Sequence, residues 1–437
     1  MRKLALALLL FALSLSFAVT YGYSRITFER TWDMHTNDDS ATVGFEAALA
    51  ANNSDQKIVA LVADQDLNIS TKNDSTVWVS YYGQPNTTAR TFKAKVIVDV
   101  DYDPHITSDP APDFSAPAAE PAGANTTAAN TTGLTSWTDD MSRQARMIAS
   151  DNSTLETIRN LAEWVHGHVE YDISYWGKTK SARDVYGERK GVCVEYTHLF
   201  LAMARSLGFQ ARYVNGYVNV GSWQPHAWAD VYLPDYGWLS VDPTFGQVGV
   251  LDSTHVALAY GNDQASTYDL FLTKTETISL EANDNLDASL TSENPKGAEI
   301  SISADNSTYL VDVAIRNTRG EYMFGSYAFL LPETYGGESY SILLLRPGQT
   351  LHQYQAINRS RMQDGYSYNV DIGAAFNDAK VQKTVVVKSG QGGSNGGATN
   401  GGAGNGGGPQ PEQPQSPCPS ALLLFAMPLA LLLFRPG

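Results

Sequence analysis

The feature that constrains the fold most is a change of periodicity between residues 193 and 243. Apolar residues recur at helical spacing over residues 194–207, and Gly208 then provides a stop signal. Further on, residues 226–232 and 238–243 alternate in character as strands do, and the Pro-Asp-Tyr-Gly segment between them is typical of a turn. A buried helix followed by an antiparallel hairpin predicts an α+β domain.

The hairpin carries two polar residues, His226 and Asp242. They share a face only if the numbers of paired residues add up to an even number, as when Tyr232 lies opposite Trp238, because an odd register turns one of them away. In that register they are diagonal neighbours within hydrogen-bond reach. We therefore expect a loop of odd length, or a bulge, between the two strands.

Cys193 opens the predicted helix, where partial positive charge and free N–H donors favour a thiolate. A thiolate nucleophile, an imidazole base such as His226 and a carboxylate such as Asp242 to fix the imidazole tautomer are the parts of a thiol catalyst. Taken singly, the three have ordinary interpretations: a buried structural cysteine, a core or surface histidine and a turn residue before a proline. Their joint pattern favours a catalytic triad.

Four segments of this region resemble the core of the transglutaminase-like superfamily in order and spacing: GVCVEY (191–196), RSLGFQARYVNGY (205–217), HAW (226–228) and GWLSVDPT (237–244). The resemblance covers roughly residues 138–265. It implies a papain-like α+β fold in which the cysteine helix packs against an antiparallel sheet. It also implies that Cys193 is the nucleophile, His226 the base and acid, and Asp242 the orienting carboxylate.

In this family the oxyanion donors are the backbone N–H of the cysteine and an upstream side chain. Trp176 is a candidate for that side chain, although a plain core aromatic is at least as good an interpretation. Three aromatic residues are expected to pack around the site without reacting: Tyr217, Trp228 and Trp238. His198 and His255 are expected to be structural histidines, because nothing here has zinc spacing. We predict no metal and no cofactor.

Residues 23–103 and 266–388 alternate in short strand patterns, and each predicts an all-β domain of the Ig-like sandwich type. Residues 104–137 are rich in Pro, Ala, Thr and Asn and predict a linker. The catalytic domain over residues 138–265 then begins with helical patterns, including a capping box at residues 153–156. Three aspartates close the first β domain and could suggest a calcium site, but a solvated strand end is the simpler interpretation: Asp99, Asp101 and Asp103.

The N-terminal end predicts export. A charged start is followed by an apolar stretch to about residue 20, so residues 1–22 are interpreted as a signal peptide, with an uncleaved anchor helix as the alternative. Nine Asn-x-Ser/Thr sequons follow and fit a glycosylated surface protein. The candidate glycosylation sites are Asn52, Asn68, Asn73, Asn86, Asn125, Asn130, Asn152, Asn306 and Asn358.

The C-terminal end predicts a tether. Residues 389–417 are a Gly-, Asn- and Pro-rich linker, and residues 418–437 contain an apolar run of 14 residues. As a helix that run is about 21 Å long, which spans a bilayer core of about 30 Å poorly. The tail resembles the sorting tails of archaeal surface proteins, with Cys418 a lipidation candidate; a marginal anchor is the alternative. A bridge from Cys418 to Cys193 is not favoured, because a long flexible linker separates Cys418 from the folded part.

The net charge of -16 argues against nucleic acid as a partner. We expect a cell-surface cysteine peptidase or amidase that acts on proteins or peptides through a thioester at Cys193. Acyl transfer to an amine would use the same residues. A non-catalytic surface adhesin is the alternative from another class, and a Cys193 without solvent access would favour it.

Overall fold

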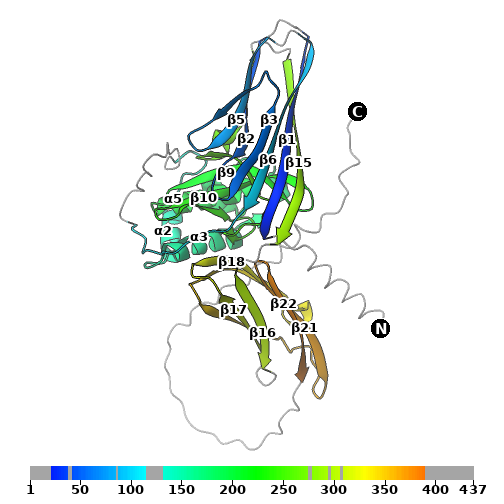
Figure 1. The fold of residues 1–437 in the computed structure, drawn as a ribbon. Coiled ribbons are helices and arrows are strands. Elements are labelled where there is room, and N and C mark those ends of the chain that lie inside the picture. Colours follow the sequence, from blue (N-terminus) through cyan, green and yellow to red (C-terminus); the bar gives the residue numbers. More distant parts are fainter. Residues whose placement is uncertain are drawn as a thin grey trace, which may run out of the picture.

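The computed structural model describes residues 21–37, 42–84, 87–114, 131–273, 278–293, 297–305 and 309–388. In these residues a central part with helices lies between two parts built from strands (Figure 1). Several predictions lie outside the described residues: the signal peptide up to residue 20, four of the sequons (Asn86, Asn125, Asn130 and Asn306), the C-terminal linker, the tail and Cys418.

The N-terminal β part consists of two four-stranded sheets. One has the order β15 (Ile278–Glu293), β1 (Gly22–Thr36), β6 (Ala89–Asp101) and β3 (Gln56–Ala63), and the other has the order β14 (Leu270–Thr273), β2 (Val43–Ala51), β5 (Thr76–Gly83) and β4 (Asn68–Thr71). Alternate residues of β1 are buried, as a strand with one face on a core requires. The core between the sheets is rich in aromatic side chains, including Trp32, Phe45 and Phe92.

The boundary predicted at residue 266 differs from the structure. The chain leaves the central part and first returns to the N-terminal sheets, where β14 pairs with β2 and β15 pairs with β1 along its whole length. The C-terminal part therefore begins only at β16. The strand patterns were predicted correctly, but a pattern of alternation does not say which sheet a strand joins.

The central part contains the helices α2 (Asp139–Ile148), α3 (Thr154–His168), α4 (Ala182–Glu188) and α5 (Cys193–Ser206). The hydroxyl of Ser153 accepts a hydrogen bond from the N–H of Glu156 at 2.9 Å, so α3 begins at the predicted cap. A five-stranded antiparallel sheet packs against α5 in the order β12 (Gln247–Val248), β11 (Gly237–Asp242), β10 (Trp223–Leu233), β9 (Ala211–Asn219) and β13 (Val256–Gly261). Shorter elements complete this part: β7 (Glu170–Tyr171), η2 (Ile173–Tyr175), β8 (Lys190–Gly191) and η3 (Gln264–Thr267).

The C-terminal β part again pairs two sheets over one core. The first has the order β16 (Ala298–Asp305), β17 (Leu310–Asn317) and β20 (Thr350–Ala356); the second has the order β19 (Glu338–Leu345), β18 (Met323–Leu330), β21 (Ser367–Phe376) and β22 (Ala379–Lys388), with η4 (Glu333–Tyr335) between β18 and β19. The predicted α+β core flanked by β-rich parts thus describes the molecule, while the Ig-like type of the flanks stays a prediction.

The ends of the predicted linker are packed rather than free. Ile106 forms a β-bridge with Tyr322, and Asp109 accepts hydrogen bonds from the Ser153 hydroxyl and the Leu155 N–H at the start of α3. Composition missed this because the contacts come from only two positions, the backbone of Ile106 and the carboxylate of Asp109. Within the described residues, no helix has the length and apolar character needed to cross a membrane.

Candidate active site

The start of α5 is built to present Cys193. A Cβ on Gly191 would lie 2.3 Å from the Cβ of Glu195, so glycine is needed for the chain to enter the helix here. The Glu195 carboxylate turns back and accepts hydrogen bonds from the N–H groups of Val192 and Lys180, both at 3.0 Å. Cys193 is therefore the first residue of a capped helix, as predicted, and it carries a free thiol.

The β10–β11 hairpin has the predicted register. Tyr232 lies opposite Trp238, and Leu233 opposite Gly237, which leaves a loop of three residues. His226 and Asp242 consequently share a face, and the Nε2 of His226 lies 2.8 Å from Oδ2 of Asp242. The even register predicted from the two residues' roles is confirmed.

The His226 ring connects the hairpin to α5. Its Nε2 is used by Asp242, which leaves Nδ1 for the Cys193 thiol, and the thiol is close enough to influence the pKa of the ring. Burial lowers the pKa of His226, but the charge and hydrogen bond of Asp242 and then the contact with Cys193 raise it to about 10. Phe245 stacks on the ring at 4.8 Å between centroids, so the imidazole is held on its face as well as at its edge.

Asp242 has all its lone pairs engaged. Its Oδ1 accepts the N–H groups of Thr244 at 2.8 Å and Phe245 at 3.2 Å, and Oδ2 faces the imidazoles of His226 and His255. Burial alone would raise the pKa of this carboxyl, but the two histidines hold it well below its usual range. Asp242 is therefore an ionised carboxylate at neutral pH.

His255 is the functional candidate that the sequence did not reveal. Its Nε2 lies 3.1 Å from Asp242 Oδ2, so it belongs to the site and is more than the structural histidine that was predicted. It precedes β13, which approaches β9 closely because Gly216 has no side chain; a Cβ there would lie 2.0 Å from the carbonyl oxygen of Val256. His255 lies outside the four motifs of the sequence, and its position in the chain does not predict this contact.

The ligating atoms of His226, Asp242 and His255 lie within 4.8 Å of one another, a spacing that a metal ion could also use. The separations of 2.8 and 3.1 Å between nitrogen and oxygen are hydrogen-bond lengths, and a single carboxylate oxygen serves both rings. We therefore describe the cluster as a hydrogen-bonded array.

Two of the remaining predicted residues, Trp176 and His198, form no hydrogen bond with this array among the described residues. Trp176 is 52% exposed, and no contact to Cys193 is found for it among the described residues. Tyr171 is an aromatic residue on which the site does act. Burial raises its pKa, and the charges of Cys193 and Asp242 raise it further. His198 is structural as predicted, with Nδ1 donating to the carbonyl of Lys180 and Nε2 accepting from the N–H of Gln264.

The aromatic residues expected around the site are only partly there. Trp228 packs edge-on against His255 at 5.2 Å. Tyr217 donates instead to Asp284 at the N-terminal β part, and Trp238 packs against Tyr232 and Arg212. The calcium alternative has no support, because two of its aspartates are paired with arginines: Asp99 with Arg25 and Asp103 with Arg319.

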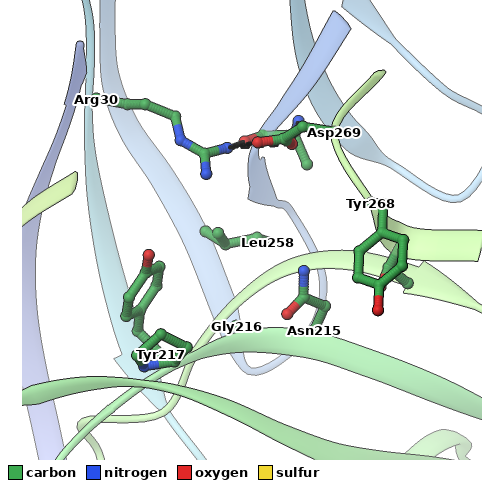
Figure 2. Close-up of a pocket in the computed structure, with 10 residues that line it drawn as sticks. Arg30, Asn215, Gly216, Tyr217, Leu258, Tyr268 and Asp269 are labelled. Carbon is green, nitrogen blue, oxygen red and sulfur yellow. Dashed lines mark hydrogen bonds and ion pairs between the residues drawn. The ribbon is translucent and has the colours of Figure 1, made fainter. Parts of the chain in front are cut away.

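Access to the sulfur is narrow. Cys193 is 4% exposed, His226 5% and Asp242 fully buried, although Gln224 and Pro225 beside His226 are exposed. A cavity of about 210 Å³ opens next to Pro225, between β9 and the N-terminal sheets. Figure 2 shows Arg30 and Asp269 joined on one side of it, with Asn215, Tyr217 and Tyr268 around the space. Five candidate glycosylation sites are exposed: Asn52, Asn68, Asn73, Asn152 and Asn358.

Residues 142–243 match the model of the Transglutaminase-like superfamily, so the chain contains a domain of this superfamily. An uncharacterized protein of Mycobacterium tuberculosis is 29% identical over 125 residues, which cover 25% of this chain and 39% of that protein. The kyphoscoliosis peptidase of Mus musculus is 32% identical over 135 residues, which cover 28% of this chain and 19% of the peptidase. This chain therefore spans less than half the length of either relative.

Among solved structures, a candidate cysteine protease from Cytophaga hutchinsonii has 18% sequence identity and a TM-score of 0.45; the match covers 63% of this chain and 94% of that chain. These comparisons show similarity to each of these proteins and do not assign their activities to this chain.

Proposed function

We propose that the transglutaminase-like domain is a cysteine hydrolase of peptide or isopeptide bonds in which Cys193, His226 and Asp242 form the catalytic triad. The observation that carries this proposal is the convergence of the three side chains, with His226 bonded to Asp242 and close to Cys193. The Cys193 sulfur belongs to the first residue of a capped helix, its charge and hydrogen bonding influence the pKa of the imidazole, and Nε2 of the imidazole lies 2.8 Å from the carboxylate. The names of the superfamily and of the related peptidase support the same chemistry.

The reaction follows from this arrangement. His226 takes the thiol proton, and the sulfur attacks the carbonyl carbon of the substrate amide to form a tetrahedral intermediate. The developing oxyanion can be met by the backbone N–H of Cys193, because the first N–H groups of a helix have no intrahelical acceptor. When the C–N bond breaks, the proton on His226 passes to the leaving amine, and the acyl group remains on the sulfur as a thioester.

The second half of the reaction uses the same residues. A water molecule gives a proton to His226 and attacks the thioester carbon, and the proton returns to the sulfur as the carboxylic acid leaves. Asp242 stays ionised throughout and keeps the proton of His226 on Nε2, so that Nδ1 faces the sulfur. An amine in place of the water would give acyl transfer instead, and the residues named here do not choose between the two.

The proposed place of action is the cell surface. The apolar N-terminal stretch, the sequons and the apolar C-terminal run support an exported protein that is held by its C-terminal tail and acts on surface proteins or peptides. The Gly- and Asn-rich segment before the tail would give the domains a reach of roughly 30 Å.

A second candidate function has one specific observation in its favour. Cys193 is only 4% exposed, as expected if the domain is a folded spacer in a non-catalytic surface protein. The placement of His226 is the argument against it, because a spacer has no need for a buried histidine that is bonded to a buried carboxylate and lies close to a thiol.

The deciding experiment is labelling of the full chain with a thiol-directed acyl probe. We expect the wild-type protein to be labelled at Cys193, and Cys193→Ala and His226→Ala to be unlabelled, with circular dichroism spectra unchanged in both variants. His198→Gln, which alters a buried histidine away from the sulfur, is the matched control and should still be labelled. An unlabelled wild-type protein would favour the spacer.

Addition of a tagged primary amine to the labelled protein separates the two acyl acceptors. If the proposal holds, the acyl group is released to water at a rate that the amine does not change. Recovery of the acyl group on the amine would instead identify an acyltransferase.

A further inference from the structure

Asp242 lies in the middle of a longer buried array. Its Oδ2 lies 2.8 Å from Nε2 of His226 and 3.1 Å from Nε2 of His255, and the other nitrogen of His255 lies 2.9 Å from Oδ2 of Asp252. None of these four residues is more than 5% exposed. Cys193 therefore faces one end of a continuous chain of two imidazoles and two carboxylates.

The neighbours of His255 fix its protonation state. Its Nδ1 faces the Asp252 carboxylate and also the Asp252 carbonyl oxygen at 3.1 Å, and its Nε2 faces Asp242. All these oxygens are acceptors, so both nitrogens must carry hydrogen and the ring is an imidazolium. Burial opposes the charge, but Asp252 and then Asp242 raise the pKa of His255 to about 9. His255 is therefore a buried cation at neutral pH.

A cation beside Asp242 opposes the effect of the Asp242 charge on the protonation of His226. The two imidazole centroids are 5.3 Å apart, and both rings draw on one carboxylate oxygen. The positive charge of His255 repels a proton on His226 and makes that proton easier to release. The same charge favours a negative sulfur on Cys193. Asp252 holds the cation in place through Nδ1.

The other groups whose charges act on this array are mostly neutral. Burial raises the pKa of each of the surrounding tyrosines, which are Tyr21, Tyr102, Tyr171 of β7, Tyr196 of α5, Tyr213 of β9 and Tyr340 of β19. Burial also lowers the pKa of His166 of α3. Glu195 lies on the α5 side, where two backbone N–H groups hold its carboxylate. Among the described residues, His255 and Asp252 are thus the charged groups outside the triad that belong to the hydrogen-bonded array around Asp242.

We propose that His255, held by Asp252, is a positioning residue that sets the pH range in which the Cys193–His226 pair is reactive. This inference rests on the proposed function, since it assigns a role within the same site. It does not depend on whether water or an amine accepts the acyl group.

The test is the rate of alkylation of Cys193 by iodoacetamide, measured between pH 4 and 11 on the full chain. The wild-type protein should give a bell-shaped profile whose limbs report the sulfur and the imidazole. In His255→Gln both limbs should move to higher pH by about one unit, because a nearby positive charge is lost. The double variant His255→Gln, Asp252→Asn should move them in the same direction without leaving a buried carboxylate unpaired.

His198→Gln is the matched control, because His198 is also fully buried and bonded but its ring does not contact Asp242. It should leave both limbs where they are. A second measurement needs no variant: nitrogen-15 NMR of the wild-type imidazoles at pH 7 should find hydrogen on both nitrogens of His255.

Two failures can be told apart. If the wild-type profile is flat and unchanged in His226→Ala, the triad itself is wrong. If the wild-type profile is bell-shaped and depends on His226, but His255→Gln and the double variant leave its limbs in place, the role of His255 is wrong. A neutral His255 ring in the NMR spectrum would also overturn it.

Discussion

At the scale of single residues, Asp242 is the position where the loss of one acceptor oxygen should lower catalysis most. In Asp242→Asn the single amide oxygen can face either the two imidazoles or the two backbone N–H groups of Thr244 and Phe245, and the NH2 group must face the other pair of donors. His226 therefore loses either its acceptor or the fixed position of that acceptor. We expect kcat to fall by about 10³-fold or more, with a smaller change in KM. Steady-state hydrolysis of a labelled peptide pool at the pH optimum would measure this.

Asp230→Asn is the control for that variant. Asp230 is another buried carboxylate of the β10–β11 hairpin, but it pairs with Arg212 at 2.8 Å and contacts no triad residue. Its replacement should lower the melting temperature and leave kcat nearly unchanged. Equal losses of kcat in both variants would mean that the hairpin responds to lost stability and that Asp242 has no special role.

The pKa of His198 predicts how the free energy of unfolding depends on pH. Burial lowers its pKa from 6.5 to about 4, so the unfolded chain binds a proton between these values and the folded protein does not. This contribution to the free energy of unfolding is complete above pH 6.5 and is lost as the pH falls towards 4, by about 3 kcal/mol in total. Urea unfolding at pH 7 and pH 5 should be less different in His198→Gln, whose amide can keep both hydrogen bonds.

Residue-scale prediction from sequence succeeded where two residues share one local element. His226 and Asp242 lie on adjacent strands of one hairpin, so the parity of the register was enough to place them together. His255 reaches the same carboxylate from a segment that pairs with β9 on the far side of β10, and no local pattern encodes that approach. The role of Trp176 as an oxyanion donor stays a prediction, since it follows a short 3-10 helix and its side chain is 52% exposed.

At the scale of elements, β13 is fixed by a side chain from another part of the chain. The amide of Gln56 accepts from the N–H of Ala257 at 2.8 Å and donates to its carbonyl at 2.9 Å, next to a register shift in β13. Gln56→Ala would leave buried donors and acceptors unpaired and should lower the free energy of unfolding by roughly 2–4 kcal/mol. Gln382→Ala, at an exposed position on β22, should cost almost nothing in the same denaturant experiment.

The alternation of apolar and polar residues predicted the strands, but it did not predict which sheet each strand joins. β1 accepts partners on both edges, β6 on one side and β15 on the other, although β15 follows more than two hundred residues later in the chain. Alternation defines which face of a strand is buried and says nothing about which edge it joins. The predicted domain boundary at residue 266 therefore failed while most of the strand segments held.

At the scale of the whole molecule, Arg30 joins the start of the chain to the segment that returns from the central part. It binds Asp284 of β15 through two nitrogens at 2.7 and 3.0 Å and also pairs with Asp269 (Figure 2). Arg30→Ala would leave two carboxylates without their cation and should cost roughly 3–5 kcal/mol. Limited proteolysis should then cleave between residues 262 and 293 first; an unchanged cleavage pattern would contradict this role for Arg30.

The C-terminal β part contacts the segment after Asp242 through two hydroxyls, of which Ser326 donates to the Gly246 carbonyl at 3.1 Å and Tyr340 also reaches Phe245. The Tyr340 hydroxyl lies 3.0 Å from the carbonyl oxygens of both Phe245 and Gly246, and the Phe245 ring is the one that stacks on His226. Tyr340→Phe keeps the ring but loses this hold, so the imidazole should be less well oriented and kcat should fall by about 3–10-fold, from a loss of about 1 kcal/mol. Tyr354→Phe, at an exposed position on β20, should leave kcat unchanged. If Tyr340→Phe lowers the melting temperature but not kcat, the C-terminal part supports the fold alone; if kcat falls at constant stability, it supports the orientation of His226.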